Sequence, residues 1–173
     1  MISERTKKMK KRLFTLLMTA VLAVLMLAAC GESAASYATD VPVSKLEAAA
    51  LAVLPADADL ATVSEDYIKG MMKIDPSAFV EYVVKIQAAG ANIDEFGIFK
   101  APSDEAVESV KKIAEDYIAY SIDSWMPEYM PEEFPKMEKA SVKVMGRYVV
   151  YCILDDDLKT EVFTAIENIL LGK

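Results

Sequence analysis

The chain has 173 residues with 19 basic residues, 27 acidic residues and no histidine, so its formal net charge is −8 at pH 7. Such an acidic chain is repelled by nucleic acid and by anionic lipid headgroups, which argues against a nucleic-acid partner. Because histidine is absent, the sequence excludes metal sites built from imidazole and catalysis by a Ser-His-Asp or Cys-His arrangement.

The first 29 residues have the pattern of a secretory signal peptide. Six basic residues lie between Arg5 and Arg12, and the following segment 13–29 is apolar except for two threonines. Residues 27–30, Leu-Ala-Ala-Cys, then resemble the bacterial lipobox. In that motif the cysteine sulfur receives a diacylglycerol, and the cysteine becomes the new N-terminus after cleavage. The resemblance implies lipid attachment at Cys30.

Cleavage before Cys30 predicts a protein anchored on the outer face of the cell membrane, because two acyl chains such as palmitate hold a protein there. The alternative is an uncleaved membrane helix over 13–29, which would span about 26 Å, just short of a ~30 Å hydrocarbon core. Residues 30–41 are expected to form a lipidated flexible tether, since they are mostly small and polar. Residues 42–173 are expected to form a single globular domain.

The first helix of this domain is expected to begin with a capping box. Ser44 would be the N-cap and Glu47 follows three residues later, before an apolar run that ends at Pro55. Residues 56–74 mix acidic and apolar side chains, and fit either a strand or a loop around a helical turn. A short helical turn is expected at 75–78, where a proline lies near its start.

The next three elements show clear periodicity. Apolar residues alternate along 80–86, and a second β-like segment follows at 93–99, which together predict an antiparallel pair of strands. Ser103 is expected to begin a helix, because two acidic residues occupy its first turn and apolar residues recur every three or four positions as far as Ile118.

The last part of the chain predicts a loop, a hairpin and a helix. Three prolines within 125–135 forbid a continuous helix, which predicts a loop with one helical turn after Pro131. Strands at 141–145 and 147–154 predict a hairpin whose glycine supplies a positive φ. The acidic triplet 155–157 is expected to cap a final amphipathic helix.

The resulting order α-β-β-α-β-β-α predicts an α+β fold. We expect a four-stranded, mainly antiparallel sheet with the helices packed on one face. Both faces of the segment 148–154 are apolar, so this strand is expected to be central.

One cluster of large side chains is a candidate binding surface, because aromatic and methionine side chains on a proline-stiffened loop lose little entropy on contact. Its residues are Trp125, Met126, Tyr129, Met130 and Phe134. The alternative is that these side chains simply cover one end of the sheet.

No catalytic or metal-binding residue stands out, and no cofactor is predicted. Glycoside hydrolysis needs two carboxylates, yet none of the 26 acids in residues 30–173 is singled out by an apolar setting. The triplet 155–157 and the pair Asp57 and Asp59 lack the ligand spacing and glycine of a calcium loop. Cys152 lies among β-branched and aromatic residues, so we expect a small buried side chain and not a catalytic thiolate.

Beyond the lipobox, three further motifs resemble a family of Gram-positive, mainly clostridial, lipoproteins that is known only as a domain of unknown function. They are the strand 95–100 leading into the helix from Ser103, the residues around 129–132 (Tyr-Met-Pro-Glu), and the glycine-centred hairpin 145–149. The resemblance covers about residues 42–155 and implies an extracytoplasmic lipoprotein, without catalytic or ligand residues.

The sequence therefore predicts a non-enzymatic accessory or binding protein of unknown ligand, anchored in the membrane by lipid, with a protein or the cell wall as its partner. The alternatives are a carboxylate-based cell-wall hydrolase and a purely structural partner of a membrane complex.

Overall fold

Five strands form one antiparallel sheet in the computed structural model of the protein, which describes residues 36–89, 92–126 and 128–173. The order across the sheet is β1-β2-β3-β5-β4. The strands are β1 (Leu60–Thr62), β2 (Glu81–Gln87), β3 (Glu95–Lys100), β4 (Ser141–Met145) and β5 (Tyr148–Ile153). The expected signal peptide, Cys30 and the first half of the expected tether, residues 30–35, lie outside the described residues.

The α+β class and the antiparallel sheet are confirmed, but the predicted number of four strands was wrong. The additional strand is β1, which pairs Leu60 with Gln87 of β2. β1 lies in the stretch 56–74 that fitted either strand or loop, and its three residues are too few for a period of two to be visible. β5 is an interior strand, as expected, since it lies between β3 and β4.

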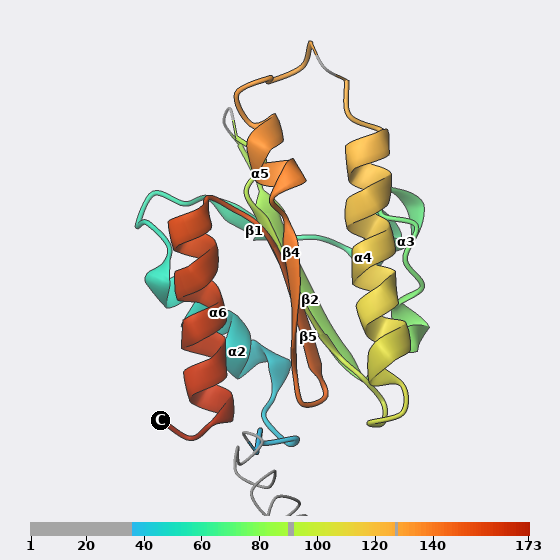
Figure 1. The fold of residues 1–173 in the computed structure, drawn as a ribbon, viewed down its shortest axis with the longest axis vertical. Coiled ribbons are helices and arrows are strands. Elements are labelled where there is room, and N and C mark those ends of the chain that lie inside the picture. Colours follow the sequence, from blue (N-terminus) through green and yellow to red (C-terminus); the bar gives the residue numbers. More distant parts are fainter. Residues whose placement is uncertain (1–35, 90–91, 127) are drawn as a thin grey trace, which may run out of the picture. The chain divides into compact units, whose positions relative to one another are not determined.

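Helices cover both faces of the sheet, so the prediction of helices on one face was wrong (Figure 1). The physical reason is that every residue of β3 and β5 is buried, so each face of these strands must be covered. On one face lie α2 (Val43–Val53) and α6 (Asp156–Leu170), and on the other lie α3 (Glu65–Gly70), α4 (Val107–Asp123) and α5 (Phe134–Glu138). A short 3₁₀ helix, η1 (Pro76–Ala78), precedes β2 and confirms the turn expected there.

The beginning of α2 differs from the expected capping box. Pro42 is the N-cap and makes no side-chain capping bond, so Ser44 lies inside the helix. The Val43 N–H instead donates to the Glu81 carboxylate of β2, at 2.9 Å. The cap therefore comes from a residue distant in sequence, which ties the helix to the sheet.

The other expected helix starts also shift. α4 begins at Val107, and Ser103 lies in the preceding turn. Asp155 occupies the N-cap of α6 but makes no capping hydrogen bond, while Asp156 forms ion pairs with Lys139 and Lys159. These carboxylates still lie at the positive end of the helix dipole.

The two predicted hairpin pairings are confirmed. β2 pairs with β3, and β4 pairs with β5 through the two-residue turn 146–147. Gly146 has a φ of +61°, and it stands at the first central position of the turn, where a type II′ turn requires a positive φ.

The packed part of the chain begins before residue 42. The Tyr37 hydroxyl donates to Glu167 of α6 at 2.6 Å, and the Ala38 N–H donates to the Leu170 carbonyl at 2.9 Å. The Val41 carbonyl accepts a hydrogen bond from the Tyr148 hydroxyl, also at 2.6 Å. Residues 37–41, which we expected in the tether, therefore lie against the domain. Among the helices that the structure describes, none has the length and apolar character needed to cross a bilayer.

Candidate functional site

The aromatic-proline segment 125–134 connects α4 to α5 and separates into a packed part and an exposed part. The Trp125 ring lies 5.6 Å from the Phe134 ring and 6.2 Å from the Tyr129 ring, between centroids. Trp125 and Phe134 are half-buried against the core on the α4 side of the sheet. These two side chains therefore contribute to the packing of the domain.

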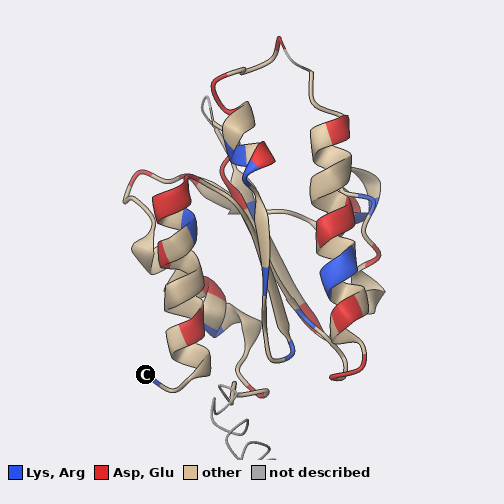
Figure 2. Ribbon diagram, in the orientation of Figure 1, with Lys and Arg blue, Asp and Glu red and all other residues tan. Residues whose placement is uncertain are grey.

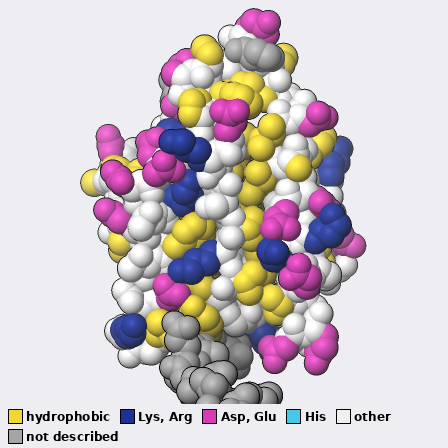
Figure 3. All heavy atoms as spheres, viewed as in Figure 1, with side chains coloured by type: hydrophobic (Ala, Val, Ile, Leu, Met, Phe, Trp, Pro, Cys, Tyr) yellow, Lys and Arg dark blue, Asp and Glu magenta, His cyan; other side chains and the backbone are white. Residues whose placement is uncertain are grey.

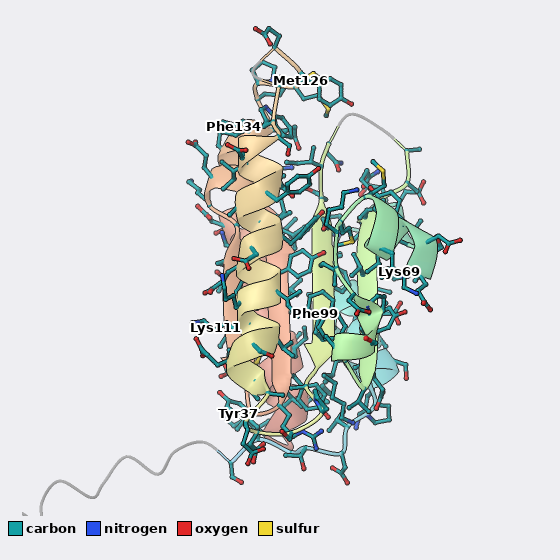
Figure 4. All side chains as sticks on the ribbon, turned by 90° about the vertical axis from the view of Figure 1, so that its right-hand side faces the viewer. Tyr37, Lys69, Phe99, Lys111, Met126 and Phe134 are labelled. Atoms are coloured by element: carbon teal, nitrogen blue, oxygen red, sulfur yellow. The ribbon has the colours of Figure 1, made fainter. Side chains whose placement is uncertain are left out.

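Met126 and Tyr129 are the exposed part of the segment. Their side chains are 65% and 58% exposed, while Met130 is half-buried with a φ of +47°. Figure 4 shows Met126 at the end of the domain opposite to Tyr37, with Phe134 beneath it. The structure thus brings the five predicted residues into one segment, but leaves only two of them largely open to solvent.

The surroundings of this segment are acidic. Asp123, Glu128 and Glu132 are exposed, and no Lys or Arg occurs between Lys112 and Lys136 (Figure 2). Large apolar side chains with carboxylates around them form a surface suited to contact with a cationic protein partner.

A charged network fixes the base of the segment. Lys136 of α5 lies 2.8 Å from Asp94 and 3.0 Å from Glu133, and all three side chains are less than one-fifth exposed. The Glu133 carboxylate also accepts the Ile93 N–H at 3.1 Å. These contacts hold α5 against the loop before β3, so the exposed residues project from a fixed base.

A second candidate centre is a buried carboxylate that the sequence analysis missed. Glu95, at the start of β3, accepts hydrogen bonds from the Tyr151 hydroxyl at 2.5 Å and from the Tyr117 hydroxyl at 3.2 Å. Burial raises the pKa of Glu95 to about 7, although both hydrogen bonds oppose this shift. Burial and the charge of Glu95 also raise the pKa of Tyr67 on α3, a helix that packs on the same side of the sheet.

The geometry around Glu95 depends on a glycine. Gly97 pairs directly with Tyr151 on β5, and a Cβ atom at Gly97 would overlap the Tyr151 ring. The absent side chain lets this ring lie flat over β3, so that its hydroxyl reaches Glu95. The signal in the sequence was an acid and a glycine at alternate positions of a strand whose residues 96–99 are otherwise apolar.

The Glu95 carboxylate differs in its surroundings from the carboxyl groups of a glycosidase. Such enzymes hold two carboxyl groups about 5–10 Å apart on either side of a substrate. The hydrogen-bond partners of Glu95 are tyrosine hydroxyls, and its side chain is buried, so it is not open to a substrate. Within residues 36–89, 92–126 and 128–173, no group of three or more Cys, Asp or Glu side chains is placed to hold a metal ion.

The remaining sequence candidates lie apart from both centres. Cys152 is fully buried on the opposite face of the sheet, and burial raises the pKa of its thiol. Asp57 lines a pocket of about 150 Å³ with Leu54, Asn92 and Leu158. That volume is below the ~300 Å³ at which small-molecule sites begin.

A comparison with known protein families found a match that covers more than half of the chain. The model described as a domain of unknown function (DUF4358) matches residues 55–154. This range contains the whole sheet, the helices of the α4 side, Glu95 and the aromatic-proline segment, whereas α2 and α6 lie outside it. No curated protein and no solved structure was found to match the chain. The chain therefore belongs to the family of the domain of unknown function DUF4358.

Proposed function

We propose that this protein is a lipid-anchored, extracytoplasmic accessory protein that binds a protein partner through the exposed residues of the segment 125–134. The observation that carries the proposal is the exposure of Met126 and Tyr129 on a segment whose base is packed and ion-paired. Aromatic and methionine side chains held in this way lose little entropy on binding.

The anchor is supported by the residues of the N-terminus. The basic cluster, the apolar segment 13–29 and the lipobox-like residues 27–30 follow one another as in a lipoprotein signal. Of the two cysteines, Cys152 is buried within the sheet, so Cys30 is the candidate for acylation.

The short distance in sequence between Cys30 and the packed chain predicts an orientation. Six residues separate Cys30 from Tyr37, and at full extension they reach about 20 Å. The end of the domain that holds Tyr37 would therefore face the membrane. Met126 lies at the opposite end (Figure 4), so the contact surface would point away from the bilayer, toward the wall or another protein.

Photocrosslinking in intact cells tests this function. With p-benzoylphenylalanine in place of Tyr129, the full-length protein is expected to give a discrete adduct, and Met126→Asp should reduce it about tenfold because a charge replaces apolar contact area. The same probe at Tyr67, which is 37% exposed on α3, is the control and should give no such adduct. Equal adducts at both positions, or none at position 129, would overturn the proposal.

The alternative of a cell-wall hydrolase gains no support from Glu95, because its carboxylate is buried and bonded to two tyrosine hydroxyls. We therefore propose the binding function alone.

A further inference from the structure

One edge of the sheet is open. β4 is an outer strand whose single neighbour is β5, and both α4 and α6 contact it. Figure 1 looks onto this edge, with β4 between α6 and α4. In the same direction, Figure 3 shows a pale strip of backbone and polar side chains flanked by hydrophobic side chains.

The register shows which backbone groups of β4 are free. Met145 and Tyr148 flank the two-residue turn, so they form a hydrogen-bonded pair, and Lys143 pairs in the same way with Val150. The alternate residues Val142 and Val144 therefore direct their N–H and C=O groups away from β5. Within the described residues, neither residue has another backbone or side-chain partner. Two donors and two acceptors are thus spaced two residues apart, which an extended strand matches.

The side chains on this edge are alternately apolar and polar. Val142 lies opposite Tyr151 and belongs to the α4 side, where Val144, two residues on, is 36% exposed. Ile122, one turn beyond the buried Ile118 of α4, is also 36% exposed. A strand added to β4 would find apolar surface on the α4 side.

The charge at the centre of β4 does not obstruct pairing. Lysine on an edge strand commonly deters the addition of a further strand. Here the Lys143 ammonium lies 2.9 Å from the Glu167 carboxylate of α6, so it is held on the opposite face and away from the free edge. The other edge of the sheet offers few backbone groups for pairing, because β1 has only three residues.

The net charge favours a partner protein over a second copy of this chain. Residues 30–173 contain 13 basic and 26 acidic residues, so two copies would repel each other, whereas a basic segment would be attracted. We propose that β4 is a site of strand addition, which binds an extended segment of a basic partner protein whose alternate side chains are apolar. The site is separate from Met126 and Tyr129, and its test does not depend on the lipid anchor.

Amide hydrogen exchange of the full-length protein in detergent micelles tests the proposal. The probe is the synthetic peptide Lys-Val-Thr-Val-Thr-Val-Lys, and its control has the same sequence with N-methylated valines, which cannot complete a strand pairing. The peptide should slow exchange at Val142 and Val144 about tenfold, as expected for a new backbone hydrogen bond. Lys143 serves as an internal control, because its N–H is already bonded to β5 and should not change.

A proline variant is the second part of this test. Val142→Pro removes an outward N–H and leaves the bonds to β5 in place, so it should weaken peptide binding about tenfold without unfolding the sheet. Lys143→Ala keeps the backbone and should bind normally. Unchanged exchange at Val142 and Val144, or equal protection by the N-methylated peptide, would overturn the proposal. Protection that depends on protein concentration without peptide would also overturn it, since it would indicate a second copy on this edge.

Discussion

Glu95 shows how one residue can govern the pH dependence of the whole domain. Its carboxyl group is buried at the start of β3, and two tyrosine hydroxyls are its hydrogen-bond partners within the described residues. Burial raises its pKa from 4.5 to about 7. Between these two values the folded protein retains a proton that the unfolded chain releases, so the free energy of unfolding falls as the pH rises through this window.

Replacement of Glu95 should therefore flatten the pH dependence of stability. A shift from 4.5 to about 7 corresponds to about 3 kcal/mol between pH 4 and pH 8. We expect Glu95→Gln to lose most of this slope in urea unfolding at pH 4, 6 and 8. Glu115→Gln, at an exposed position on α4, is the control and should keep the slope of the native protein. An unchanged slope in Glu95→Gln would show that other groups set the pH dependence.

The sequence did not single out Glu95, and the reason is physical. Tyr151 and Tyr117, which bind it, are 56 and 22 residues away in the chain, and only the pairing of β3 with β5 and the packing of α4 bring them together. The burial of Cys152 was correctly predicted, because its immediate neighbours are apolar and need no tertiary information. Local composition thus revealed burial, but not the partners of a buried polar group.

At the scale of elements, the local sequence pattern predicted the longer strands reliably. It did not predict helix caps that depend on tertiary contacts, such as the cap of α2. The strands at 80–86, 93–99, 141–145 and 147–154 are present as β2 to β5. Alternation of apolar residues marked β2, whereas β5 was marked by a continuous apolar run beside a glycine turn. β1 was not predicted because it has only three residues. The second helical layer was missed although the apolar segment 148–154 already implied that both faces of its strand are covered. In the aromatic-proline segment, the sequence could not distinguish the packed Trp125 from the exposed Tyr129.

The cap that Glu81 provides for α2 predicts a specific loss of stability. Glu81 accepts the Val43 N–H and also pairs with Lys100, whose side chain is 10% exposed. Glu81→Ala should lower the free energy of unfolding by about 1–2 kcal/mol, because it leaves a helix end and a mostly buried ammonium without their partner. Glu108→Ala is a matched control at an exposed i,i+3 pair with Lys111, and we expect a change below about 0.5 kcal/mol. Equal losses in the two variants, measured by urea unfolding, would contradict this role.

At the scale of the whole molecule, the proposed function uses two opposite ends of one domain, one for the lipid anchor and the other for the partner. The chain enters the packed structure at Tyr37, beside α6 and the β4–β5 turn, while Met126 lies at the opposite end (Figure 4). A tether of about 20 Å would keep the Tyr37 end close to the bilayer. The same anchor would leave the acidic and aromatic end accessible to a partner. Every part of this arrangement depends on whether Cys30 carries lipid.

Mass spectrometry of the N-terminal peptide, from protein purified out of the membranes of the producing cells, tests the lipid anchor most directly. We expect a chain that begins at Cys30 and carries a diacylglycerol on the cysteine sulfur. Cys30→Ser should abolish both cleavage and lipid, whereas Cys152→Ser should leave both intact. An unmodified peptide that runs through Ala29 and Cys30, or a released protein that begins elsewhere without lipid, would contradict it.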